Sequence, residues 1–182
     1  DAFWLANLLR LGTLKEGYIY PKEDRPLRDL LRKRWHLVKL RTSLIISLKN
    51  ILSRNFGLPM KASQIKGRSL DAIVSPLPRE DNIALVVRTN KASIDFLTTQ
   101  IDEVESTVAK QAKNKPCDAK LLDLPGVGKI LALTIQLETG PASRFLKVGN
   151  YASYCRKVES RWFSNEKVKG RGNAKNGNKY LA

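Results

Sequence analysis

The residues whose types and spacing could do chemistry gather near the C-terminus. The run SRWFSNEKVKGRGNAKNGNKYLA, which starts at Ser160, combines basic side chains with three glycines and several asparagines. Lys and Arg neutralise DNA phosphates, and glycines let another backbone approach closely. We therefore expect a basic Gly/Asn-rich loop that contacts nucleic-acid phosphates through Arg161, Lys167, Lys169, Arg171, Lys175 and Lys179.

A flexible cationic tail is the alternative for this run. Trp162 and Phe163 weigh against it, because aromatic residues are rare in disordered segments. The Tyr180-Leu181 pair also restarts an apolar pattern after the glycines.

A second candidate lies upstream, in LLDLPGVGKILALTI, from Leu121 to Ile135. A Pro-Gly-x-Gly turn between two apolar stretches is the pattern of a helix-hairpin-helix motif. Gly126 and Gly128 would permit a tight turn, and the following helix would offer free backbone N–H groups to a phosphate beside Lys129. Such contacts do not depend on base sequence. A plain turn between two helices is the alternative.

Zinc and disulfide chemistry are not expected. Cys117 and Cys155 have no CxxC spacing, and His36 is the only histidine. Asp71, Asp81 and Asp95 are spread along the chain and suit helix caps or solvated surface better than a metal site.

The charge is strongly basic and concentrated at the two ends. Lys and Arg number 33 against 17 Asp and Glu, which gives a net charge of +16. Residues 1–60 hold twelve basic and five acidic residues, and residues 151–182 hold eight and two. This clustering favours a polyanionic partner, with nucleic acid first and a ribosomal or anionic membrane surface as alternatives.

Two long helices must position these candidates. Apolar pairs recur every seven residues from Leu30/Leu31 to Ile51/Leu52, which predicts a helix near 24–55 that starts at Asp24, with Pro26 in its first turn. Arg34 and Arg41 interrupt the second row of this seam.

A second seam predicts a helix near 81–112, with Asn90 as a polar rung that fixes register or partner number. The stretch 56–80, rich in Gly and Pro, is expected to be a connector. Because both seams need a partner, we expect a homo-oligomer formed through the coiled coil; a two-helix hairpin within one domain is the alternative.

The expected fold is mainly α: a long coiled-coil helical hairpin, then a small helical domain with the helix-hairpin-helix motif and the basic loop. Residues 1–22 would form one unit that opens with a short helix ending at Gly12. Residues 23–115 would form the coiled-coil region with its connector, and residues 116–182 the small helical domain. Asp1 is not an initiator methionine, and Lys179-Tyr180-Leu181 resembles an unfinished helix, so both ends look cut. No signal peptide or long apolar run is evident, so a soluble, cytoplasmic protein without membrane contact is expected.

The order of four segments resembles the DEDD-type insertion-sequence transposases, also called bridge-RNA-guided recombinases. These segments are DAFWLANLL at the start, then LPGVGK, YASYCRKV and the basic loop ending in KNGNKYL. The start is similar to the end of that family's RNase-H-like domain, and a coiled coil follows in the family too.

The resemblance implies that Ser164 is a nucleophile that forms a phosphoserine link to DNA; Ser160 falls outside the matching position. Asp1 would be the last of four acidic ligands to Mg²⁺, with the other three upstream of this chain, so that the fragment alone would be inactive. Ser164-Asn165 departs from the common Ser-Gly, and Glu159 from a proline.

The expected function is thus a DNA transposase or site-specific recombinase that cuts and rejoins DNA, with a guide RNA as a further candidate partner. A non-catalytic helix-hairpin-helix module dimerised by a coiled coil is the alternative, and a coiled-coil ribosome-associated protein is a third. Covalent capture on DNA separates the first from the other two.

Overall fold

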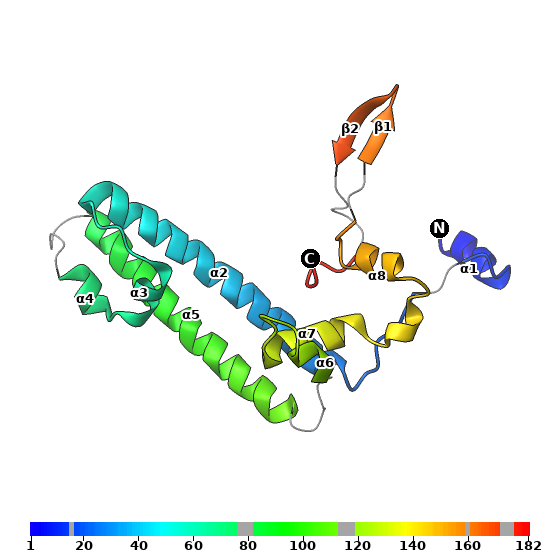
Figure 1. Cartoon of the computed structure of the whole chain (residues 1–182), viewed down its shortest axis with the longest axis horizontal. Helices are drawn as coiled ribbons and strands as arrows, with labels where there is room; N and C mark the ends of the chain where they lie inside the picture. The colour runs from blue at the N-terminus through cyan, green and yellow to red at the C-terminus, as the bar shows by residue number, and fades with distance from the viewer. Residues whose placement is uncertain (15–16, 76–81, 113–118, 159–160, 172–176) are drawn as a thin grey trace.

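A computed structural model describes residues 1–14, 17–75, 82–112, 119–158, 161–171 and 177–182. The protein is mainly helical, with one two-stranded sheet in the part of the chain that is described. Two long helices form a rod, a group of shorter helices lies at one end of it, and a β-hairpin projects from that group (Figure 1). The expected mainly α fold is confirmed.

The rod consists of α2 (Arg25–Phe56) and α5 (Asn82–Ala112), within about one residue of the predicted bounds. Pro26 lies in the first turn of α2, where its missing N–H costs nothing. Asp24 is the N-cap residue, although its side chain makes no capping hydrogen bond. Gly57 ends α2 in a left-handed conformation, with φ 62°. At about 1.5 Å per residue, α2 is roughly 48 Å long.

The two predicted seams face each other within one chain. The buried apolar residues of α5 that lie seven residues apart are Val87, Ile94, Ile101 and Val108. They face a buried side of α2 whose residues are spaced by three to eight positions: Leu27, Leu31, Leu37, Ile45, Leu48 and Leu52. The alternative of a two-helix hairpin therefore describes this rod, and the seams need no second copy. Self-association would have to use other surfaces, and it stays a prediction.

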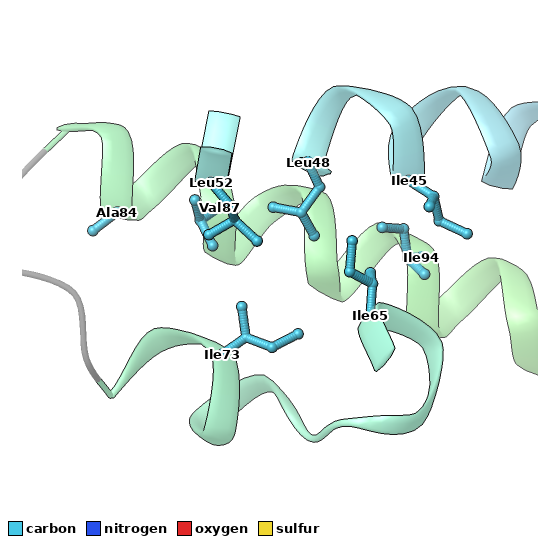
Figure 2. Close-up of a cluster of buried hydrophobic side chains, with 8 residues drawn as sticks. All are labelled: Ile45, Leu48, Leu52, Ile65, Ile73, Ala84, Val87 and Ile94. Atoms are coloured by element: carbon cyan, nitrogen blue, oxygen red, sulfur yellow. The ribbon is translucent and has the colours of Figure 1, made fainter. Parts of the chain in front are cut away.

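The expected connector contains two short helices, α3 (Ala62–Gly67) and α4 (Leu70–Val74). Ile65 and Ile73 are buried against the far end of the rod (Figure 2). They complete a cluster with α2 and α5 residues, in which Leu48 is fully buried. Fully burying a side chain of this size contributes about 1.5–3 kcal/mol. These helices were not predicted because each buries only one isoleucine, which gives no repeating apolar pattern in a stretch rich in Gly and Pro.

Polar side chains in the rod are paired across or along it. Arg34 of α2 forms an ion pair with Glu105 of α5 at 2.6 Å, and Arg41 donates to Thr98 at 3.2 Å. The arginines that interrupt the α2 seam therefore find partners on α5. Lys91 is buried and pairs with Asp95 one turn later along α5.

The near end of the rod holds the next helices, α6 (Ala119–Leu122) and α7 (Lys129–Thr139). Leu133 and Leu137 of α7 pack against Leu27, Leu31 and Val108 in a second apolar cluster. This cluster attaches α7 to both rod helices.

After α7 come the 3-10 helix η1 (Ala142–Arg144) and α8 (Val148–Tyr154), then the strands β1 (Arg161–Ser164) and β2 (Lys167–Arg171). The strands pair antiparallel as a hairpin. The expectation of a loop was wrong for residues 161–171. Residues 179–180 form a turn, so the expected start of a helix at the end of the chain was also wrong.

Helix α1 (Ala2–Arg10) ends near Gly12 as predicted, and it contains no buried residue. It lies apart from the rod (Figure 1). Among the described residues, no helix has the length and apolar character needed to span a bilayer.

Candidate nucleic-acid interface and its buried anchor

The Pro-Gly-x-Gly turn joins α6 and α7, which agrees with the helix-hairpin-helix pattern and with the alternative of a plain turn between two helices. Gly126 has φ 81°, a conformation that favours glycine, and it is exposed. Gly128 is the N-cap of α7 with φ −83°, a conformation that other residues also adopt. No atom lies within 4 Å of a Cβ built on either glycine, so the turn has an open approach.

The N-terminus of α7 opens toward a groove between α2 and α7, here called the α2–α7 groove, of about 460 Å³. Gly128 and Lys129 line one side of it, and Arg34 and Trp35 line the other. The first backbone N–H groups of a helix lack partners within that helix and carry a partial positive charge. Together with Lys129, they suit an anion such as a phosphate.

The β-hairpin ends in a two-residue turn. Asn165 and Glu166 both have positive φ values, 50° and 62°, which define a type I′ turn. Ser164 is the last residue of β1; it pairs with Lys167 and is exposed. The candidate nucleophile therefore lies at the tip of the hairpin and not in a loop.

The basic residues of the hairpin are spread along it: Lys167 lies next to the tip, and Arg161 and Arg171 pair at the open end of the strands. Lys167 and Lys169 of β2 are exposed, as is Arg161 of β1. A register shift leaves Lys169 without a partner in β1, and such bulges re-aim side chains. Arg171 ends β2, while Lys175 lies outside the described residues. Lys179 is exposed near the α2–α7 groove, with its Nζ 5.1 Å from the centre of the Tyr180 ring.

Asp1 is separated from this surface. It is the exposed N-cap residue of α1, without a side-chain capping bond. Within the described ranges, no three His, Cys, Asp or Glu side chains gather closely enough to hold a metal ion. These residues alone do not fit a metal site, and Asp1 could supply one ligand at most.

Sequence reasoning missed a buried carboxylate, Glu138, near the C-terminal end of α7. Its side chain is 1% exposed and accepts two hydrogen bonds from Arg32, from Nε at 2.5 Å and Nη2 at 2.7 Å. Asn178 donates a third through Nδ2 at 2.6 Å. The hydrogen bonds to Glu138 raise the pKa of Arg32. A single acidic residue in the apolar run LALTIQLET was the available signal.

Two tyrosines meet the backbone of the same residue. The Tyr20 hydroxyl lies 2.6 Å from the carbonyl oxygen of Glu138, and the Tyr154 hydroxyl 2.9 Å from it. The two hydroxyls are 2.7 Å apart. Burial, followed by the hydrogen bond with Tyr154, raises the pKa of Tyr20 to about 12. The Tyr20 phenol therefore stays protonated near neutral pH and can donate.

The structure thus defines a mainly helical protein with an exposed Pro-Gly-x-Gly turn and a basic β-hairpin. Residues 118–182 match the Transposase IS116/IS110/IS902 family. This match supports an insertion-sequence transposase, and with it DNA binding, for the region that holds the turn, α8 and the hairpin. No curated protein and no solved structure matches the chain.

Proposed function

We propose that this chain is part of an insertion-sequence transposase in which Ser164 attacks a DNA phosphodiester. The observation that carries the proposal is the position of Ser164, exposed at the hairpin tip beside Lys167, within the region that matches the transposase family. A projecting tip can reach a phosphate in a DNA groove or at a strand end without a clash from the rest of the protein.

In the proposed step, Ser164 Oγ forms a bond to phosphorus while the bond from phosphorus to one deoxyribose oxygen breaks. The serine proton passes to solvent or to a base, and the leaving oxygen takes up a proton to become a hydroxyl. The product is a phosphoserine link, which a DNA hydroxyl can attack in turn to rejoin strands. Lysines beside the phosphate would stabilise the charge that develops in the transition state.

DNA would be held at two places. The N-terminus of α7, with Gly126, Gly128 and Lys129, would bind one stretch of backbone, and the hairpin lysines would bind another. These contacts read phosphates and not base edges, so target choice would come from elsewhere. A guide RNA could supply it by base pairing.

Asp1 would contribute one carboxylate to a Mg²⁺ site in the full-length protein. The described residues do not complete such a site, so its further ligands would have to come from other parts of that protein. When bound, a divalent ion of this kind polarises a phosphate.

A non-catalytic DNA-binding module is the second candidate, favoured by the exposed Pro-Gly-x-Gly turn before the N-terminus of α7. Covalent capture separates the two. The full-length transposase is incubated with Mg²⁺ and a nicked substrate that carries the element's end sequence, then denatured and run on a gel. We expect a protein–DNA adduct that resists denaturation; DNA binding without an adduct would favour the non-catalytic module.

A further inference from the structure

We propose that Glu138 is a positioning residue whose buried carboxylate fixes the β-hairpin relative to α2 and α7. This inference rests on the proposed function, because it assigns Glu138 the task of aiming Ser164 at the DNA that α7 holds. No chemistry occurs at Glu138 itself.

The side chain of Glu138 joins three separate parts of the chain. It belongs to α7, its carboxylate is held by Arg32 of α2, and Asn178 of the C-terminal segment donates to the same Oε2 that accepts from Arg32 Nη2. A buried charge requires such partners because its desolvation costs several kcal/mol. Each of these bonds is directional, so the geometry of the three parts is fixed together.

The backbone of Glu138 adds two more segments. Its carbonyl oxygen is within hydrogen-bond distance of Tyr20, from the connection before α2, and of Tyr154, the last residue of α8. The two phenols have two hydroxyl protons for three contacts: one from each hydroxyl to the Glu138 carbonyl, and one between the hydroxyls. Only two of these contacts can therefore be hydrogen bonds at one time. Asn178 Nδ2 also donates to the Tyr154 hydroxyl at 3.0 Å, which closes the network.

The same network holds both flanks of the hairpin together. The backbone N–H of Asn178 donates to the Tyr154 carbonyl at 2.6 Å. Arg156 donates from Nε and Nη2 to the Gly177 carbonyl at 3.2 and 3.0 Å. Residues 154–156 precede the hairpin and residues 177–178 follow it, so the network joins the two described segments that flank the hairpin.

The two flanks of the hairpin lie in close contact at Gly177. Its φ is 87°, and a Cβ at this position would lie 2.6 Å from the Tyr154 carbonyl oxygen. A side chain here would be strained and would push the two flanks apart. Gly177 and Asn178 thus hold the two flanks of the hairpin together.

Stability alone does not explain a buried carboxylate here. Replacing a buried ion pair by packed apolar residues is often neutral or stabilising, so such a pair is weak evidence for stability. Its specific contribution is geometry. Glu138 lies about 15 Å along α7 from the Gly128 N-cap, so one helix carries the proposed phosphate site at one end and the contact to the hairpin flanks at the other.

The test uses the full-length transposase with the near-isosteric Glu138→Gln variant, which loses the charge. Glu105→Gln is the matched control, because it also removes an ion pair between a glutamate and an α2 arginine but touches no flank of the hairpin. Adduct formation is measured at saturating DNA, duplex affinity separately, and backbone hydrogen exchange by mass spectrometry over residues 154–158 and 177–182.

We expect Glu138→Gln to slow adduct formation on the order of 10- to 100-fold, because small misplacements of a reacting group have effects of this size. Affinity should change by no more than about twofold, because Glu138 contacts no DNA in the proposed complex. Exchange over both flanks should rise, and Glu105→Gln should match wild type in all three measurements.

If hydrogen exchange rises in Glu138→Gln but adducts form at the wild-type rate, Glu138 is not a positioning residue. The same conclusion follows if Glu138→Gln and Glu105→Gln slow adduct formation equally. Should Glu138→Gln fail to fold, Asn178→Ala takes its place, because it removes one donor to the network and leaves the Arg32–Glu138 pair intact. If the wild-type protein forms no adduct, the proposed function fails; unchanged exchange in the variant would refute the anchor independently.

Discussion

Removing three positive charges from the hairpin should flatten the salt dependence of DNA binding. The variant replaces Lys167, Lys169 and Arg171 by alanine, all on the β2 strand. Each phosphate contact contributes about 0.9 to the slope of log affinity against log salt for duplex DNA, so losing three lowers the slope by about 2.7. When salt rises from about 50 to 200 mM, the fold-loss in affinity should therefore be roughly 40 times smaller for the variant than for wild type.

Fluorescence anisotropy of a labelled duplex, titrated at several salt concentrations, measures this slope. The matched control replaces Lys49, Arg54 and Lys66, which are exposed basic residues at the far end of the rod near α3. It changes the net charge by the same amount but should leave the slope close to that of wild type.

Two results would refute this placement of the DNA surface. If the hairpin variant keeps the wild-type slope, the hairpin does not contact phosphates. If the control flattens the slope equally, binding follows overall charge and not the surface around Ser164.

Two further predictions concern stability. Leu48→Ala should destabilise the rod by about 2–5 kcal/mol, because Leu48 is fully buried between α2, α5 and the short helices; urea unfolding followed by circular dichroism measures this, and a loss below that range would contradict the packing. Tyr20→Phe should be less stable than wild type below pH 10, and this difference should shrink as the pH approaches the raised pKa of Tyr20, about 12, because the fold holds the protonated phenol. A stability difference that is constant from pH 8 to about 12 would contradict the sign of that pKa shift.

The rod could be predicted because its signal is repeated. Seams such as Leu30/Leu31 to Ile51/Leu52 specify helix, length and buried face at once, and both helices begin and end within about one residue of expectation. What the seams do not specify is their partner, since the same apolar rows fit a second copy or the neighbouring helix.

The hairpin could not be predicted because its turn lacks the usual glycine. Asn165 and Glu166 both adopt positive φ, and glutamate is rarely found there. The glycines nearby, at 170 and 172, suggested a loop instead. Ser164 could nevertheless be chosen as the candidate nucleophile, because the family resemblance indicates that position.

The anchor at Glu138 was beyond reach for a different reason. Its partners Arg32 and Asn178 are 106 and 40 residues away in the sequence, and no local pattern connects them. A polar residue within an apolar helix marks a position that needs a partner, but only the tertiary structure identifies that partner.

The most direct test of the central claim is to locate the covalent bond. The full-length transposase is trapped on a nicked end-sequence substrate with Mg²⁺, digested, and the DNA-linked peptide is identified by mass spectrometry. We expect the link on Ser164, and we expect Ser164→Ala to abolish the adduct while DNA affinity stays nearly unchanged, because the hydroxyl serves the chemical step and the lysines serve binding. An adduct that survives Ser164→Ala, or one that maps to Ser160, would contradict the assignment of Ser164 as the nucleophile.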